Sequence, residues 1–127
     1  MSSKISVILA LGLLMATQAT AHHGAGVFDP VNKVTVTGMV TDFQFVNPHV
    51  LVYITVKGED GKETNWGGEL TSPNRLARDA RAVKWHKSIL KAGDSITMTG
   101  HPARNGAPMM DILKIVDGQG TVLIDDE

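Results

Sequence analysis

Five histidines are the residues of this sequence best suited to bind a metal ion. Two of them, His22 and His23, directly follow Ala19-Thr20-Ala21, an A-x-A tripeptide typical of export-signal cleavage. Cleavage there would make His22 a free amino terminus, which offers a metal both its α-amine and its imidazole. The α-amine has a reference pKa of about 7.7, so a metal ion can displace its proton near neutral pH. Nitrogen ligands of this kind suit Cu(II).

Two further histidines lie next to predicted turns. His49 directly follows the turn dipeptide Asn47-Pro48. His101 lies shortly before a second turn dipeptide, Asn105-Gly106. The alternative role for His49 is a turn residue whose imidazole bonds a backbone carbonyl, and for His101 a structural role. We expect the fifth histidine, His86, at the surface.

These histidines predict a metal site, with copper as the favoured ion. In a brace of three nitrogens, His22 supplies its amine and imidazole, His49 a second imidazole, and His101 or His23 an auxiliary ligand. The alternative is that His22 and His23 are solvated terminal residues. Met109-Met110 offers thioethers to Cu(I), but methionine more often fills gaps in a core. The predicted metal ligands are therefore His22, His49, His101 and His23.

The overall composition narrows the chemistry further. The chain contains no cysteine, which excludes disulfides, thiolate metal ligands and a cysteine nucleophile. It has 12 Lys and Arg against 13 Asp and Glu, a formal net charge of −1. Such a balance does not indicate a general attraction to nucleic acid or acidic lipid.

The first 21 residues have the features of an export signal. Lys4 provides a positive charge, and Ile5–Ala16 is an apolar stretch of signal-peptide length that is too short for a comfortable membrane span. We therefore expect a periplasmic or secreted protein with no membrane span after signal cleavage. The predicted organisation is a signal peptide over residues 1–21, an arm over residues 22–32 and one domain over residues 33–127.

After the arm, apolar and polar residues alternate with a period of two, as in half-buried strands. Val34, Val36 and Val40 share one phase, and the phase changes before Phe43, which predicts a bulge at or after Gly38. Four further strands are predicted over residues 49–56, 63–70, 95–101 and 110–115, with a last short strand or tail at residues 122–124. The order of strands predicts a mainly β fold, a five-stranded barrel like that of the oligonucleotide/oligosaccharide-binding (OB) fold, with one helix between strands three and four.

That helix is expected to begin near Ser72 or the threonine before it, either of which can cap it, with Pro73 in its first turn. Leu76, Ala80 and Val83 are spaced for one apolar face. Basic residues recur at three- or four-residue steps on the same segment, which predicts a positive helical stripe, either solvated or facing an anionic partner. They are Arg75, Arg78, Arg81, Lys84, Lys87 and Lys91.

Motifs of several common enzyme classes are absent from the sequence. It contains no phosphate-binding glycine pattern, no H-E-x-x-H and no nucleophile elbow. Glu69 and Asp111 are carboxylates suited to acid–base work, but nothing in the sequence brings them together. A hydrolase is therefore unsupported. Nucleic-acid binding is disfavoured by the negative net charge and the few aromatic residues.

Four short motifs stand out along the chain. They are Ala21-His22-His23, Asn47-Pro48-His49, Ser72-Pro73-Asn74 and Gly100-His101-Pro102-Ala103-Arg104. In combination they resemble a bacterial family of small exported proteins of unknown function. The resemblance covers nearly the whole chain after residue 21 and implies an exported, β-rich domain of OB-like shape, without implying an activity. The chain departs from the family at Gly24-Ala25-Gly26, where members usually carry a larger residue after the two histidines.

The favoured function is copper binding for storage, delivery or sensing rather than turnover. A copper brace can also activate oxygen, so an oxidative enzyme is a less favoured variant. The alternative is a metal-free OB-like binding module that uses Trp66, Tyr53 and the basic stripe to hold a small anionic ligand, a saccharide or a partner protein. A third alternative is an envelope protein whose histidines form only local hydrogen bonds. The expected partner is a metal ion, with an envelope protein as a second candidate and no nucleic acid.

Overall fold

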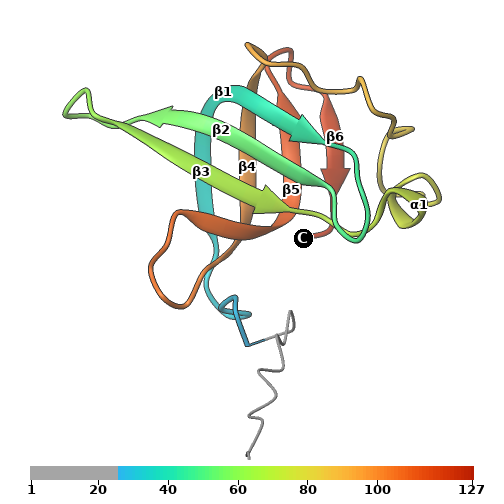
Figure 1. The fold of residues 1–127 in the computed structure, drawn as a ribbon, viewed down its shortest axis with the longest axis horizontal. Helices are drawn as coiled ribbons and strands as arrows, with labels where there is room; N and C mark the ends of the chain where they lie inside the picture. Colours follow the sequence, from blue (N-terminus) through green and yellow to red (C-terminus); the bar gives the residue numbers. More distant parts are fainter. Residues whose placement is uncertain (1–25) are drawn as a thin grey trace, which may run out of the picture.

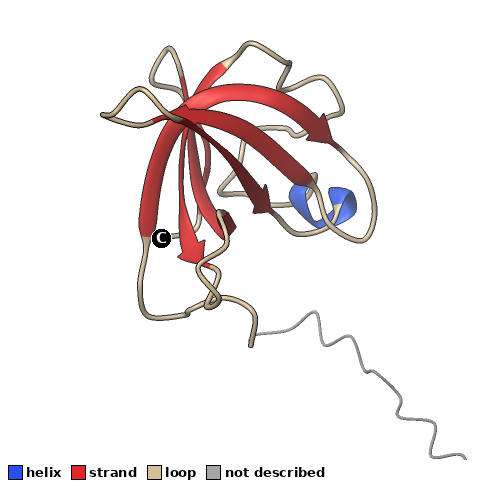
Figure 2. Ribbon diagram, turned by 60° about the vertical axis from the view of Figure 1, so that its left-hand side comes forward, coloured by secondary structure: helices blue, strands red, loops and turns tan. Residues whose placement is uncertain are grey.

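The computed structural model describes residues 26–127, so the predicted signal peptide, His22 and His23 lie outside the described residues. The domain is mainly β, with strands that curve around a common interior (Figures 1 and 2). Its elements are β1 (Val34–Gln44), β2 (Leu51–Lys57), β3 (Glu63–Glu69), α1 (Pro73–Leu76), β4 (Ser95–Pro102), β5 (Met109–Asp117) and β6 (Val122–Asp125).

Five strands close into a barrel. The sheet order is β3-β2-β1-β4-β5-β6, and an additional pairing of β3 with β5 joins the two sides. The β3–β5 pairing is parallel, whereas the other pairings are antiparallel. The short helix α1 lies between β3 and β4, so the predicted five-stranded OB-like barrel is confirmed. The predicted last strand is also present, as β6 on the outer side of β5.

The long strand β1 bends so that it can pair with β2 on one side and β4 on the other. Its register with β2 shifts between Val40 and Asp42, which confirms the predicted bulge after Gly38. At Gly38 itself the β2 backbone approaches so closely that an added Cβ would collide with the Thr55 carbonyl. Glycine at this position therefore permits the tight corner that barrel closure needs.

The interior is filled by apolar side chains from β1, β2, β4, β5 and β6, from residues next to β2 and β3, and from α1 and the segment after it. The tightly buried set comprises Val40, Val50, Val52, Ile54, Leu70, Leu76, Trp85, Leu90, Ile96, Met98, Met110, Ile112, Ile115, Leu123 and Ile124. Met98 and Met110 are fully buried here, which confirms the expected core role of Met110. Trp85 satisfies its indole N–H by donating to the Leu123 carbonyl at 3.2 Å.

The helix begins as predicted but is much shorter. Ser72 is its N-cap, and the Ser72 side chain accepts a hydrogen bond from the Arg75 backbone N–H at 3.4 Å. The helix ends at Leu76, so the predicted continuation of its apolar face to Val83 is wrong. The Val83 N–H instead donates to the Leu123 carbonyl at 3.0 Å, so the backbone there bonds to β6 rather than to a helical turn.

The basic residues that follow α1 do not lie on one helix. The stripe predicted over residues 75–91 is therefore wrong, because Arg75 alone of these basic residues falls within α1. Arg81 instead forms ion pairs with Asp79 and Asp126, and so ties this segment to the end of β6.

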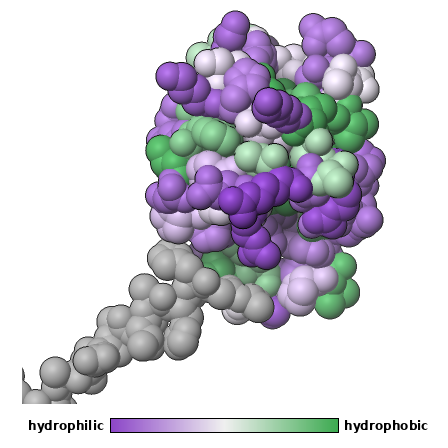
Figure 3. Space-filling view, turned by 90° about the vertical axis from the view of Figure 1, so that its right-hand side faces the viewer, coloured by the Kyte–Doolittle hydropathy of each residue, from purple (hydrophilic) through white to green (hydrophobic). Residues whose placement is uncertain are grey.

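One face of the molecule is predominantly polar (Figure 3). Figure 3 shows the face at the right of Figure 1, where hydrophilic side chains surround smaller groups of apolar ones. Among residues 26–127, no helix is long and apolar enough to cross a membrane.

Candidate functional site

Barrel closure places three polar residues in a row across neighbouring strands. Glu69 of β3 pairs with Asp111 of β5, and His101 of β4 pairs with the same Asp111. Met110 and Ile112, which flank Asp111, are buried in the core. Because side chains alternate along a strand, Asp111 and its two cross-strand partners face the outside of the barrel.

The two site histidines are each anchored through one ring nitrogen. His49 Nδ1 lies 3.0 Å from the carbonyl oxygen of Leu70, and His101 Nδ1 lies 2.8 Å from that of Asn32. A carbonyl oxygen only accepts hydrogen bonds, so each Nδ1 carries the proton and donates it. In the neutral imidazole, Nε2 then keeps its lone pair. The carbonyl contact given as the alternative role of His49 is therefore confirmed, and it leaves Nε2 free of that contact.

A short arm before β1 runs along the β4–β5 connection and forms one wall of the site. The Asp29 N–H donates to the Pro102 carbonyl at 2.9 Å, and the Arg104 N–H donates to the Val27 carbonyl at 2.9 Å. The Arg104 Nε–H also donates to the Phe28 carbonyl at 3.1 Å. These bonds fix residues 27–29 beside His101.

A turn at Asp29 holds the carbonyl that anchors His101. Asp29 Oδ1 accepts hydrogen bonds from the Val31 N–H at 2.9 Å and the Asn32 N–H at 3.3 Å. Its Oδ2 accepts from the Asn32 side-chain amide at 2.6 Å. The bond from the Asn32 amide, followed by those from the backbone, lowers the pKa of Asp29 below its ordinary value. The ionised carboxylate therefore orders the turn that positions the His101 ring.

The arm, the β4–β5 connection and the outer face of the barrel enclose a cavity of about 520 Å³. Its lining is Val27, Phe28, Pro30, His49, Glu69, His101, Ala103, Asn105, Ala107, Met109 and Asp111. Most of the wall is apolar, and the two imidazoles and two carboxylates are its ionisable groups. This combination is typical of a site that binds a small ligand or an ion.

Asp111 has a perturbed acidity in this cavity. Partial burial raises the pKa of Asp111 above its ordinary value, and the nearby His101 and His49 act in the opposite direction. Burial favours the neutral form of the Asp111 carboxyl group, whereas nearby positive charge favours its ionised form. A cation that enters the cavity would therefore favour ionised Asp111.

The structure brings together two of the four predicted metal ligands, His49 and His101. The other two, His22 and His23, lie outside the described residues. His86 is exposed as expected, and its Nδ1 accepts from the Ser88 N–H at 3.2 Å. Among residues 26–127, no three His, Asp or Glu side chains are grouped closely enough to hold a metal ion by themselves.

Nothing in the sequence indicated the pairing of Glu69 with Asp111, which the structure shows. The predicted OB-like topology implies that β3 and β5 meet, but their register depends on contacts that no local pattern encodes. Met109, considered as a thioether ligand, lines the cavity and packs its sulfur against Gly67.

The closed barrel, the short helix and the cavity under the arm define a small OB-like β-barrel domain. The chain belongs to a family of unknown function, DUF6152, whose model matches residues 11–110. The matched span includes all five histidines and ends one residue before Asp111. No curated protein and no solved structure matches the chain.

Proposed function

We propose that this protein is exported to the periplasm or secreted, and that it binds a copper ion for storage, delivery or sensing. The ion would be held by the α-amine and imidazole of a mature amino terminus at His22 and by imidazoles of the cavity, with His49 first and His101 or His23 as auxiliary. The observation that carries the proposal is that His49 and His101, far apart in sequence, line one cavity.

The orientation of the two rings supports metal binding. Metal-ligating histidines commonly donate their second ring N–H to a carbonyl or carboxylate, which fixes the tautomer and the ring orientation. His49 and His101 both have this arrangement, with Leu70 and Asn32 as the acceptors. Each ring would thereby coordinate through Nε2, and imidazole nitrogen suits copper and related ions.

The course of the arm supports a contribution from the amino terminus. Val27 already lines the cavity, so the chain that precedes it starts at the site. The residues from His22 to Val27 span up to about 17 Å when extended, which is enough to reach across a cavity of this size. The nearby carboxylates of Glu69 and Asp111 would offset the charge of a bound cation.

Native mass spectrometry of the protein exported by a bacterial host tests the proposal. The expected mass begins at His22 and increases by one copper after addition of one equivalent of Cu(II). His49→Ala and His101→Ala should weaken retention against a mild competitor, whereas His86→Ala, which removes an exposed histidine outside the cavity, should not.

A second variant tests the terminal amine directly. Protein that retains Ala21 before His22 keeps every imidazole but has no α-amine on His22. The expected result is a sharp loss of copper affinity. Correctly processed protein that holds no copper, or that holds it equally well with the extra residue, would overturn the brace.

A further inference from the structure

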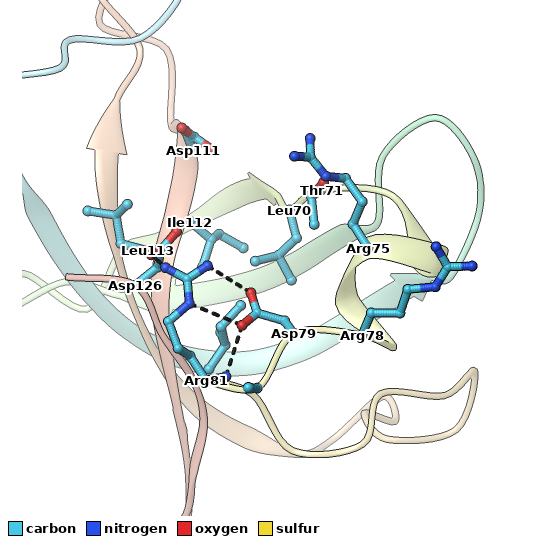
Figure 4. A pocket seen from close by; sticks show the side chains of 12 residues that line it. Leu70, Thr71, Arg75, Arg78, Asp79, Arg81, Asp111, Ile112, Leu113 and Asp126 are labelled. Atoms are coloured by element: carbon cyan, nitrogen blue, oxygen red, sulfur yellow. Dashed lines mark hydrogen bonds and ion pairs between the residues drawn. The ribbon is translucent and has the colours of Figure 1, made fainter.

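A second cavity, of about 480 Å³, lies on the side of Asp111 away from the arm (Figure 4). Its floor includes Leu70, Ile112 and Ile124, each of which is almost fully buried. Charged side chains from α1, from the segment after it and from the residue after β6 surround these apolar residues. The volume falls within the range of about 300–1,000 Å³ common for small-molecule sites.

One side of this cavity is formed by Arg81 and the two aspartates that it contacts, Asp79 and Asp126. Arg81 donates from Nε to Asp79 Oδ1 at 3.1 Å and from Nη2 to Asp79 Oδ2 at 3.0 Å. Its Nη1 contacts Asp126. The hydrogen bond with Asp79 raises the pKa of Arg81 and lowers that of Asp79. Three of the five N–H donors of Arg81 are therefore used in contacts with Asp79 and Asp126.

Two further arginines, Arg75 and Arg78, line the other side of this cavity. Arg75 lies in α1 and Arg78 just after it, and both line the cavity. Among residues 26–127, neither guanidinium forms an ion pair. Figure 4 shows both on the α1 side, across the cavity from Arg81 and Asp126. Each guanidinium presents five N–H donors in a planar fork that matches a carboxylate or phosphate group.

We propose that this cavity binds a small organic anion, whose carboxylate or phosphate group is held by Arg75 and Arg78 and whose apolar part lies on Leu70 and Ile112. The ligand's anionic end faces the α1 side because Asp111 lines the cavity across from Arg78. A hydrogen-bond donor at the other end of the ligand would face that carboxyl group. Asp111 is the one described residue that lines both cavities; Arg75, Arg78 and Arg81 line only this one, so the proposed contacts with the anion do not depend on copper.

A titration followed by ¹H–¹⁵N and methyl NMR tests this inference, with benzoate and phenyl phosphate as probes and benzamide as the uncharged comparison. Binding of either anion should shift the Arg75 and Arg78 Nε–H signals and the Leu70 and Ile112 methyl signals. Benzamide should shift them little. The two anions together establish whether carboxylate or phosphate is preferred.

Arg75→Gln and Arg78→Gln should each weaken binding about tenfold, the typical effect of losing a charge-assisted hydrogen bond. Arg78→Lys should retain part of the affinity, because it keeps the charge without the fork. Lys87→Gln, a charge loss at an exposed residue outside the cavity, is the matched control. Shifts confined to other surfaces, no binding at about 10 mM probe, or equal affinity in the arginine variants and the wild type would overturn the proposal.

Discussion

Glu69 and Asp111 lie side by side because the barrel closes through the parallel pairing of β3 with β5. The same Asp111 is paired with His101 across β4 and β5. The pairing of β3 with β5 therefore closes the barrel around its core and also brings carboxylate and imidazole groups together on the outer face of the barrel. Site and barrel depend on the same register, so a change that loosens the β3–β5 contact should affect both.

Asp111→Asn should stabilise the metal-free protein at neutral pH. Burial raises the pKa of Asp111, so its ionised form is less stable in the folded chain than in the unfolded one. This cost is present above the folded-state pKa and is absent below the ordinary value of 3.8. The difference in melting temperature between variant and wild type should therefore shrink as the pH falls toward that value. A difference that grows on acidification would contradict the assignment.

Gly68→Ala should destabilise the protein by about 1–3 kcal/mol, the usual cost of overpacking a core. A Cβ at Gly68 would meet the side chain of Ile112, the residue next to Asp111. Urea denaturation measures the loss. Gly26→Ala is the control because an added Cβ there meets nothing within 4 Å. Equal stability of the two variants would show that the β3–β5 contact is looser than described.

The strands and the position of the helix could be predicted because they depend on local periodicity. For example, Val52 and Ile54 of β2 and Val50 just before it alternate inward and are fully buried. The length of the helix could not be predicted: the helix ends at Leu76, and the backbone at Val83 bonds instead to Leu123 of β6, a distant partner that no local pattern indicates. Tertiary contacts of this kind override local helix propensity.

The candidate site was predictable only in part. Turn dipeptides predict that His49 and His101 lie close to turns, and the two histidines line one cavity. The carbonyl partners of their rings and the Glu69–Asp111 pair depend on the register of distant strands. For His49 the sequence left open a carbonyl contact or a metal-ligand role; its Nδ1 makes the carbonyl contact, and the residue also lines the cavity.

Asp29→Ala should release the turn that anchors His101. Its carboxylate accepts hydrogen bonds from Val31 and Asn32, and the Asn32 carbonyl in turn accepts from the ring. Amide hydrogen exchange at residues 31 and 32 should accelerate, and the ¹⁵N shifts of the His101 ring should move toward a mixture of tautomers. Asp60→Ala is the matched control, because Asp60 makes a similar turn contact with Lys62 in the β2–β3 connection.

Acid should imitate the Asp29 variant. The pKa of Asp29 is lowered in the fold, so its stabilising contribution is present above the ordinary value of 3.8 and is lost as the pH falls below that value through the folded-state pKa. The amide of Asn32 should therefore lose protection in wild-type protein only below that value. Loss of protection near pH 6 would instead point to a histidine as the controlling group.

His49→Ala and His101→Ala should each lower Cu(II) affinity by at least about tenfold, since even changes to groups that only orient a metal ligand cost about 10–100-fold. If both Nε2 atoms bind the same ion, the effects of the two substitutions should not be additive, because the ligands share one coordination sphere. Competition titrations of the single and double variants give the coupling, and electron paramagnetic resonance reports the loss of nitrogen ligands. Affinity should also fall on acidification, because protons compete with the metal ion for its nitrogen ligands. Strictly additive losses with an unchanged spectrum would place the two histidines in separate roles.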